Sequence, residues 1–593
     1  MKNYKIFFLL LIFILLQSNT LSTIRYVKAG NPTPVAPYTS WATASDSLWK
    51  ALRISVSGDT VFVGNGSYLL DFDTLQQGVA LIGSGIDSCI FNLHHLSNLN
   101  NFSFVVSDSS LISNIQFRGY NYFDGFGIFG TNCNNTIITN NLFTKCNNAV
   151  ACVGIKIISN QFILNQTAIN EPLSTLSPVQ ISENTFVNCT NSIGLRGSKA
   201  IIRNNYFYVD ITPDPTFILD YGGGRPEITN NIFVFSGLDF FNLIAAHNGT
   251  ALQNNVMISL IRWTDPIILT DYPIISKNNH FEGEVNAYDL LYQAIGPQLV
   301  IRNNNYWKIL NKYYPAYNNP YEYTELKKDA MFVNDYTDFH LQKYSPLIDR
   351  GDSSVLDKDG SISDIGVYGG PLGESYVYID KAPRAPVGLT VTLNADTVLL
   401  KWRKNTESDI RKYYIYTDST TNVTTDTNRY LTSVNDTLLK IPKIYFSSSS
   451  AYFRIVAVDS GYNKSQGGIA VGVVLTGMDE GGELAGERYK LYQNYPNPYG
   501  GAGKEKTKIS YELKKRGYVK LRVYNVVGEE LAVLVNGEQE AGYYEEEFGA
   551  PEVRKGLEKH ILTSGIYIYK LEIRDSETGH PVFNESRKML FVK

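Results

Sequence analysis

Short runs of alternating apolar and polar residues recur through the first 370 residues of the chain. Most runs place an apolar residue three positions before an asparagine and an aromatic residue or methionine two positions after it, as in Ile202-Arg-Asn-Asn205-Tyr-Phe207. These key asparagines are spaced 19, 24, 21, 26, 24, 24 and 25 residues apart and are Asn141, Asn160, Asn184, Asn205, Asn231, Asn255, Asn279 and Asn304. A period in the twenties is typical of a solenoid, in which each repeat buries its apolar face by stacking on its neighbours.

The repeat unit favours a parallel β-helix over helical or leucine-rich solenoids. Its runs are short and rich in β-branched and aromatic residues, and they leave no room for a helix of about ten residues. Equivalent positions of successive coils then stack at the strand spacing of ~4.8 Å, so isoleucine lies on isoleucine and phenylalanine on phenylalanine inside the coil. Asparagine at the bend tolerates the left-handed backbone of a tight turn, and its amide can bond to the next asparagine in a ladder.

The same register places the cysteines. Cys133 and Cys152 each precede a key asparagine by eight residues, so we expect them on adjacent coils, either as a disulfide or as stacked thiols. Cys146 and Cys189 each follow a key asparagine by five residues, but Asn165 takes that position on the coil between them. Two coil spacings, ~9.6 Å, are too far for a disulfide.

Composition excludes one function class and reveals a boundary. The chain has 593 residues and a net charge of −4, so it has no basic excess with which to bind nucleic acid. Its length indicates several domains. Charged residues are about twice as dense after Tyr489 as before it, which marks the C-terminal hundred residues as a separate module.

The stretch from about Ile24 to Val377 resembles the right-handed parallel β-helices of the pectin-lyase-like superfamily. It opens with Arg25-Tyr-Val-Lys28 and Ser57-Gly-Asp-Thr-Val61 and closes with Asp338-Phe-His-Leu341 and Asp364-Ile-Gly-Val-Tyr368. The resemblance implies a fold and no particular chemistry, because that superfamily includes lyases, hydrolases, adhesins and inert stalks.

Two further modules follow. Residues 382–475 resemble a fibronectin type III domain, with Val398-Leu-Leu-Lys-Trp402 and Tyr413-Tyr-Ile-Tyr416, and a Gly/Glu-rich linker spans 476–488. Residues 489–593 resemble the type A C-terminal sorting domain of the type IX (Por) secretion system, on Tyr489-Lys-Leu-Tyr-Gln-Asn-Tyr-Pro-Asn-Pro498 and Ser564-Gly-Ile-Tyr-Ile-Tyr-Lys-Leu571. We therefore predict an all-β chain, with a right-handed parallel β-helix over 23–378 followed by two β-sandwich domains.

The N-terminus predicts export. Lys2 and Lys5 precede eleven apolar residues, Ile6 to Leu16, and small or polar residues follow. As a helix this segment is only ~16 Å long, too short for a hydrocarbon core of ~30 Å, so we interpret residues 1–22 as a signal peptide and expect no transmembrane segment in the mature chain. With the sorting-domain resemblance, this implies a protein outside a Gram-negative bacterium or on its outer-membrane surface, delivered by the type IX machinery. We also expect a monomer.

The longest coils contain the candidate site residues. His247 and Asp271 both precede a key asparagine by eight residues on consecutive coils, where they could act as a base and its orienting carboxylate, with Arg225 and Asp220 nearby. Carboxylates beside a tryptophan and an arginine also suit a sugar-binding surface; these candidates are Asp239, Arg262, Trp263 and Asp265. The alternative is a solvated pair of loops with a chance match in register.

No other motif identifies a reaction. The sequence motifs of polygalacturonases and pectate lyases are absent. A run of aspartates includes Asp357, Asp359 and Asp364, and carboxylates are ligands that calcium prefers. The run lacks the EF-hand spacing, so a turn-rich cap is the simpler interpretation. No other cofactor is indicated. We hypothesise a β-helix that binds an extracellular polysaccharide without cleaving it. The alternatives are a polysaccharide lyase or glycoside hydrolase, and a passive stalk.

Overall fold

The computed structural model describes residues 22–593 with gaps. The gaps are 71, 94–102, 120–125, 131–132, 172–177, 198, 211–214, 221–223, 237–243, 247–249, 260–267, 271–273, 288–291, 295–299, 310–312, 315–319, 476–488, 495–496, 498, 500–505, 526–527, 550–551, 556–557, 562, 564, 577 and 592–593. The chain divides into two compact units, 1–379 and 380–593. Among the described residues, no helix is long and apolar enough to cross a membrane.

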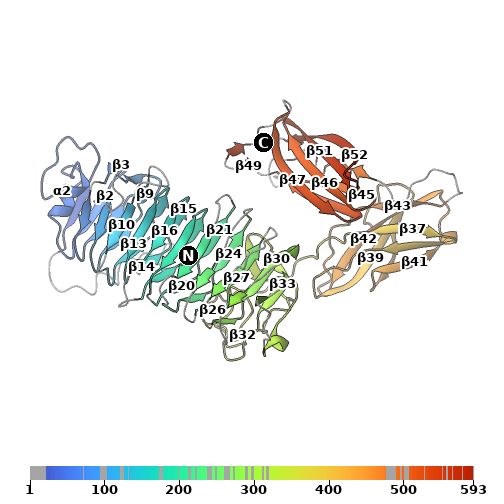
Figure 1. The fold of residues 1–593 in the computed structure, drawn as a ribbon, viewed down its shortest axis with the longest axis horizontal. Helices are drawn as coiled ribbons and strands as arrows, with labels where there is room; N and C mark the ends of the chain where they lie inside the picture. Colours follow the sequence, from blue (N-terminus) through green and yellow to red (C-terminus); the bar gives the residue numbers. More distant parts are fainter. Residues whose placement is uncertain are drawn as a thin grey trace. The chain divides into compact units, whose positions relative to one another are not determined.

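The first unit is a parallel β-helix with three strands in each coil, and its strands stack side by side from β2 to β32 (Figure 1). Sheet A contains, in order, β1 (Ile24–Val27), β2 (Thr60–Val63), β5 (Ala80–Gly83), β8 (Leu111–Ser113), β11 (Ile137–Thr139), β14 (Lys156–Ile158), β17 (Gln180–Ser182), β20 (Ile201–Arg203), β23 (Glu227–Thr229), β26 (Ala251–Gln253), β29 (Ile275–Lys277) and β32 (Val300–Arg302). Sheet B contains β3 (Gly66–Leu69), β6 (Cys89–Asn92), β9 (Gln116–Arg118), β12 (Leu142–Thr144), β15 (Gln161–Ile163), β18 (Thr185–Val187), β21 (Tyr206–Val209), β24 (Ile232–Phe235), β27 (Val256–Ser259), β30 (His280–Ala287) and β33 (Asn305–Ile309). Sheet C contains β4 (Asp73–Leu75), β7 (Phe104–Val106), β10 (Phe126–Gly130), β13 (Asn148–Cys152), β16 (Thr167–Asn170), β19 (Asn191–Leu195), β22 (Thr216–Asp220), β25 (Ile244–Ala246), β28 (Ile268–Thr270), β31 (Tyr292–Ala294) and β34 (Tyr313–Tyr314).

Like residues stack on like residues inside the coil, as the repeat predicts. The rings of Phe117, Phe143, Phe162, Phe186, Phe207 and Phe233 follow one another at centroid distances of 4.6 to 5.0 Å, with interplanar angles of 12° or less. Ile138, Ile157 and Ile181 are likewise in register and fully buried. At the N-terminal end, the helix α2 (Leu48–Arg53) packs Leu48 and Leu52 against this core.

Within each asparagine pair, one residue forms the left-handed bend and the next forms the hydrogen-bonded ladder, whereas the sequence suggested that one residue does both. The first residue of each pair has a left-handed backbone, with φ of 56° at Asn140 and 54° at Asn230, and serine or glutamate also takes this position at Ser159 and Glu183. The second residue is buried and forms the ladder. Asn205, for example, donates through Nδ2 to Oδ1 of Asn231 at 3.0 Å. The expectation that the ladder asparagine itself supplies the left-handed bend is therefore wrong by one position.

The ladder is continuous from Asn141 to Asn304 in the described coils, because each member accepts and donates in turn. Asn184 donates to Asn205 at 3.1 Å and to the carbonyl of Ile157 at 2.8 Å. The backbone N–H of each member also donates to the next Oδ1, as from Asn231 to Asn255 at 2.9 Å. The buried amide groups are thereby satisfied without water.

All five cysteines are buried thiols. Burial is the main reason that the pKa of Cys152 is well above its usual value, and the side chain of Cys133 next to it raises the pKa further. Of the two alternatives for this pair, the structure therefore has adjacent thiols. Asn165 lies between Cys146 and Cys189 as expected: its Oδ1 accepts from the N–H of Cys146 at 2.9 Å, and its Nδ2 lies 3.9 Å from Sγ of Cys189.

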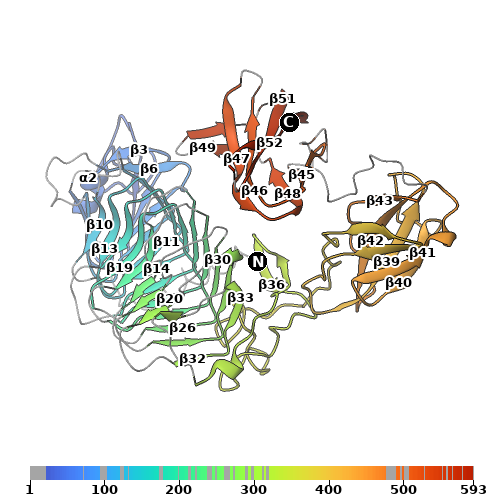
Figure 2. The ribbon, with the colours of Figure 1, turned by 45° about the vertical axis from the view of Figure 1, so that its right-hand side comes forward.

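The chain that follows the last coil returns along the outside of the β-helix. It contains η1 (Glu322–Thr324) and the hairpin of β35 (Phe332–Asn334) and β36 (Asp338–Leu341), and β36 is labelled in Figure 2. Phe332, Phe339 and Leu347 pack with Val256 and Ile258, whose side chains face outward from β27. The predicted turn-rich segment therefore covers a flank of the coil.

The second unit contains two sets of antiparallel strands. In residues 380–475, three strands, β37 (Thr390–Asn394), β38 (Thr397–Lys401) and β41 (Leu438–Pro442), are in one sheet; β40 (Tyr430–Val434), β39 (Ile410–Asp418), β42 (Ser450–Asp459) and β43 (Val471–Val474) form the other, with η2 (Lys443–Tyr445) between β41 and β42. Their shared core includes Trp402 and Tyr413, with ring centroids 5.3 Å apart.

The C-terminal residues form a three-stranded sheet of β44 (Lys490–Leu491), β45 (Thr507–Leu513) and β48 (Gly542–Phe548), a four-stranded sheet of β47 (Glu530–Gln539), β46 (Gly517–Tyr524), β51 (Gly565–Asp575) and β52 (Pro581–Phe591), and the pair β49 (Glu552–Lys555) and β50 (Glu558–Ile561). The predicted all-β class, a β-helix followed by sandwich-like sheets, is confirmed.

Candidate functional site

A polar groove lies where sheet A turns into sheet B in the early coils. It has a volume of about 490 Å³ and is lined by Ser84, Gly85, Ile86, Asp87, Ser88, Asn114, Asn140, Asn141, Ser159 and Gln161. The turn between β5 and β6, residues 84–88, supplies five of these residues, whereas each of the next coils contributes one or two, from its turn or, for Gln161, from the start of β15. The groove therefore has one longer loop as a wall and repeated short turns as a floor.

The floor exists because the left-handed turn repeats. Asn114, Asn140 and Ser159 have φ of 61°, 56° and 58° and occupy the same position in successive coils. Each is followed by a residue that points into the coil, so its own side chain points outward. Successive side chains along this line are separated by the strand spacing of about 4.8 Å. We call the outward line of Asn114, Asn140, Ser159, Glu183 and Asn204 the open edge.

The amides of the groove are available to a ligand. Within the described parts of the chain, the side chains of Asn114, Asn140 and Gln161 make no hydrogen bond. Ser159 donates to Glu183 at 3.1 Å, and Ser84 and Ser88 bond to each other at 3.2 Å. Asp87 is the one ionisable residue of the lining, so the groove is rich in neutral donors and acceptors.

In the later coils the same edge is already occupied. The outward asparagines there form hydrogen bonds to residues 350–369 of the returning segment. We call this line of Asn230, Asn254, Asn278 and Asn303 the covered edge. Asn230 donates to the carbonyls of Val367 and Gly369, both at 2.7 Å. Asn254 donates to the carbonyl of Asp364 at 2.9 Å, and Asn278 accepts from the N–H of Asp352 at 2.6 Å. The covered edge thus binds a polar, turn-rich segment of chain through contacts on successive coils.

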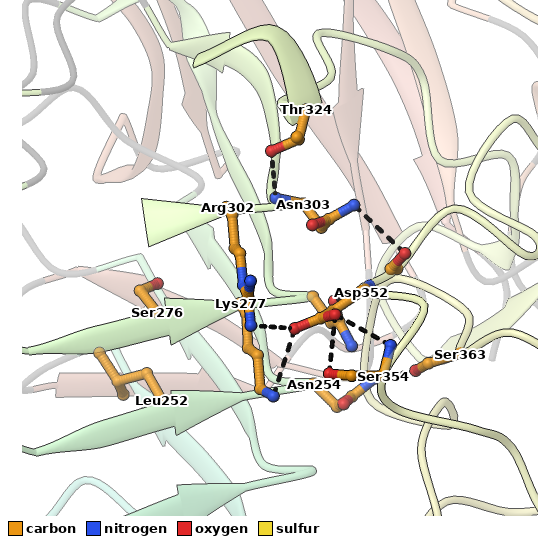
Figure 3. A network of polar contacts seen from close by, with 12 residues as sticks. Leu252, Asn254, Ser276, Lys277, Arg302, Asn303, Thr324, Asp352, Ser354 and Ser363 are labelled. Carbon is orange, nitrogen blue, oxygen red and sulfur yellow. Dashed lines mark hydrogen bonds and ion pairs between the residues drawn. The ribbon is translucent and has the colours of Figure 1, made fainter. Parts of the chain in front are cut away.

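Charge reinforces this attachment at one point, shown in Figure 3. Lys277 and Arg302, which end β29 and β32, both reach Oδ2 of Asp352, at 3.4 and 2.6 Å. Burial alone would raise the pKa of Asp352. The hydrogen bonds from Ser354 and the charges of Lys277 and Arg302 together outweigh burial, so the pKa lies below its usual value. Asn303 in the same view bonds to the hydroxyl of Thr324 and to the chain beside Asp352.

The aspartates considered as calcium ligands accept hydrogen bonds from turns of this segment. Asp357 accepts from the N–H groups of Gly370 and Asp364, and Asp364 accepts from the N–H of Asp349 at 2.9 Å and the hydroxyl of Tyr378 at 2.8 Å. Asp359 is exposed and bonds to Ser361. Burial raises the pKa of Asp364 to about 6, with smaller contributions from the charges of Asp357 and Asp349. These contacts show a turn-forming role for the three residues.

Most of the predicted site residues of the long coils lie outside the described residues: His247, Asp271, Asp239, Arg262, Trp263 and Asp265. Asp220 ends β22, and only its backbone is described. Arg225 is exposed, with φ of 53°, in the turn before β23. A catalytic or sugar-binding role for this set stays a prediction.

One charged network was missed by the sequence reasoning. His280 on β30 is fully buried; its Nδ1 lies 2.8 Å from Nδ2 of Asn305, and its Nε2 lies 3.5 Å from Glu282. Lys308 pairs with Glu282 at 2.7 Å. Burial acts to raise the pKa of Glu282, but His280 and Lys308 lower it overall. The i, i+2 spacing of His280 and Glu282 on one strand was the sequence signal for this network. The ring of Phe332, in the returning segment, packs against the His280 ring with centroids 5.1 Å apart, so the network also contacts that segment.

Comparisons with known proteins add likenesses of low similarity. No protein-family profile matches the chain. No curated protein sequence matches it either. Among solved structures, pectate lyase Pel9A is similar at 14% identity over 59% of this chain and 96% of its own, with a TM-score of 0.38. The A-module of the mannuronan C-5 epimerase AlgE4 of Azotobacter vinelandii is similar at 12% identity over 47% of this chain and 94% of its own, with a TM-score of 0.27. The central fibronectin-III array of RIM-binding protein is similar at 15% identity over 36% of this chain and 71% of its own, with a TM-score of 0.19.

Proposed function

We propose that the β-helix binds an extracellular polysaccharide in the groove between residues 84–88 and the open edge. The observation that carries this proposal is the row of amides without hydrogen-bond partners in the described chain, at Asn114, Asn140 and Gln161. Hydroxyl groups of a sugar both donate and accept hydrogen bonds, and so do side-chain amides. A linear polymer can meet an amide on two successive coils, at Asn114 and Asn140, and the hydroxyl of Ser159 on the next.

The covered edge supports the proposal from within the molecule. There the same turn position binds neutral backbone groups of the returning segment through amide hydrogen bonds of 2.6 to 2.9 Å. The open edge has the same left-handed turns, and no described residue bonds to the side chains of Asn114 and Asn140. The groove volume of about 490 Å³ is within the range of ~300–1,000 Å³ common for ligand sites.

The groove lining favours binding over hydrolysis. Glycoside hydrolysis ordinarily uses two carboxyl groups that flank the bond to be cleaved. The lining contains one, Asp87. A neutral, hydroxyl-rich glycan also fits this surface better than a polyanion, because the lining contains no lysine or arginine.

Export completes the proposal. Residues 1–22 serve as a signal peptide, residues 382–475 as a fibronectin type III-like spacer, and residues 489–593 as a sorting domain for type IX secretion and surface attachment. The sequence resemblances support this arrangement, as does the separate core of the C-terminal strands, which includes Tyr511, Leu521 and Tyr569.

The test is affinity electrophoresis of the purified chain through gels that contain neutral or acidic polysaccharides, with each polymer analysed for shortening afterwards. We expect retardation in at least one neutral polysaccharide and no shortening. Shortened chains would indicate the lyase or hydrolase alternative. Normal migration in every polymer would indicate a stalk and would overturn the proposal.

A further inference from the structure

Three aspartates from distant parts of the sequence meet at one end of the middle module, residues 380–475. Asp380 precedes the first strand of the module, Asp409 comes directly before β39, and Asp459 ends β42, where it pairs with Ile410. One carboxylate oxygen of each aspartate lies within 4.8 Å of those of the other two. This is the spacing at which one cation can contact all three.

Two of these carboxylates are removed from water. Asp459 is 0% exposed and Asp409 is 8% exposed. Burial, together with the negative charges of Asp459, Asp380 and Glu407, raises the pKa of Asp409 to about 6. Buried like charges at this spacing repel one another, and either a proton on one carboxylate or a cation among the three removes that repulsion.

Asp409 faces the cluster, and among the described residues its carboxylate accepts a hydrogen bond only from its own backbone N–H. Its carboxylate accepts no hydrogen bond from another residue that the structure describes. Asp459, by contrast, accepts from the N–H and the Nδ2 of Asn463 at 2.7 and 3.1 Å. A nine-tenths buried carboxylate that accepts from no other described residue and faces two more carboxylates has lone pairs left for a cation.

The backbone leaves room for this convergence at Gly461. A Cβ atom placed there would lie only 1.9 Å from Oδ2 of Asp380. Any residue with a side chain would therefore displace the Asp380 carboxylate. The glycine allows Asp380 to reach the end of β42.

We propose that Asp380, Asp409 and Asp459 bind a calcium ion. Hard divalent cations prefer oxygen ligands, and Ca²⁺ takes six to eight of them from mono- or bidentate carboxylates, carbonyls and water. The trio offers no thiolate or imidazole, which disfavours zinc. Mg²⁺ demands a stricter octahedral arrangement and keeps more of its water, so Ca²⁺ is the better match.

The ion would fasten the start of the module to its sandwich. The N–H of Arg384 already donates to Glu407 at 2.6 Å, and Asn405 donates to the carbonyl of Arg384 at 2.8 Å. Both contacts join residues 380–386 to the turn before β39. Calcium would add a bond from Asp380 to the ends of β39 and β42, and would thereby order the point at which the chain enters the module.

The test is calorimetric titration of the chelator-treated full chain with CaCl₂ and, separately, with MgCl₂. We expect one Ca²⁺ per chain, with a Kd of about 10⁻⁴ to 10⁻³ M as in extracellular modules, and at least tenfold weaker Mg²⁺. Asp409→Asn should weaken Ca²⁺ by tenfold or more. Asp396→Asn, at the exposed turn between β37 and β38, and Asp359→Asn, in the other acidic segment, should leave the affinity unchanged.

Thermal unfolding separates a ligand role from a structural one. Without calcium, Asp409→Asn should unfold at the same temperature as the parent chain or a higher one, because it removes repulsion; with calcium, only the parent should gain several degrees. Absence of calcium binding in the parent chain, or binding that Asp409→Asn leaves intact, would overturn the proposal. So would binding that Asp359→Asn abolishes, since that would place the ion in the other segment.

Discussion

The side-chain amide of Asn230 donates a 2.7 Å hydrogen bond to the carbonyl of Val367, 137 residues later in the chain. A second bond from the same amide, to Gly369, is equally short. Through this contact and its equivalents on neighbouring coils, a turn residue that shapes the coil also binds the turn-rich returning segment on the outside. On the open edge, Asn114, Asn140 and Asn204 present the same residue type in the same position.

Replacing Asn230 by glycine should loosen the returning segment and leave the coil intact. Glycine accepts the left-handed backbone of this position, so only the two amide hydrogen bonds are lost, about 1 kcal/mol each. Hydrogen exchange of residues 347–370 should become faster. Asn204→Gly, the same change on the open edge, is the control and should leave that exchange unaltered; equal protection in both variants would show that Asn230 does not hold the segment.

Removing one member of the ladder should cost far more. Asn205→Ala deprives both the N–H and the Nδ2 of Asn184 of their acceptor and deletes the donors of Asn205 to Ile181 and Asn231. Each buried group left without a partner costs about 1–3 kcal/mol. Chemical denaturation should show a loss of about 2–4 kcal/mol. A loss below about 1 kcal/mol would mean that the ladder is not a major source of stability.

The register of the coil was predictable from sequence because it rests on repetition. Residues at a fixed distance from Asn141, Asn160 and Asn184 meet the same neighbours on each coil, which is why Asn165 could be placed between Cys146 and Cys189. The division of labour within each asparagine pair was not predictable to the residue, because asparagine suits both the left-handed position and the ladder.

The site was less predictable than the fold, because it depends on contacts without a period. Nothing in the spacing of Asp352 shows that it meets Lys277 and Arg302, and Asp380, Asp409 and Asp459 are brought together only by the strand order of the middle module. The groove likewise arises from a single longer turn, residues 84–88. Long-range contacts of this kind are decided by tertiary packing.

The returning segment should be held more tightly in mild acid. The pKa of Asp364 is raised to about 6 by burial, above the ~3.9 of an unfolded chain, so the folded state binds this proton more strongly. Its contribution is fully present below about pH 4 and is lost as the pH rises to about 6, by up to ~3 kcal/mol. Hydrogen exchange of residues 347–370, corrected for its intrinsic pH dependence, should show more protection at pH 5 than at pH 7.5.

Asp364→Asn supplies the control for this pH dependence. The amide imitates the neutral acid, so the variant should be protected equally at both pH values. If the variant keeps the full difference in protection, another group is responsible.

The thiols should resist modification in the native protein. Burial raises the pKa of Cys89 and of Cys146 to about 12 and that of Cys189 to about 11, so little thiolate forms at neutral pH. Mass spectrometry after iodoacetamide treatment should show no alkylation of the native chain and five alkylated cysteines after denaturation. A mass lower by two hydrogens, with Cys133 and Cys152 protected even after denaturation, would show a disulfide instead.

The most direct measurement of the central claim is the affinity of the groove for a polysaccharide that retards the chain. Asn114→Gly/Asn140→Gly keeps the left-handed turns and removes two amides from the lining, whereas Asn204→Gly makes the same kind of change outside it. Titration calorimetry should show binding about tenfold weaker or more in the double variant, since two hydrogen bonds of about 1 kcal/mol are lost, and within twofold of the parent in Asn204→Gly. Unchanged affinity in the double variant would contradict a polysaccharide site in this groove.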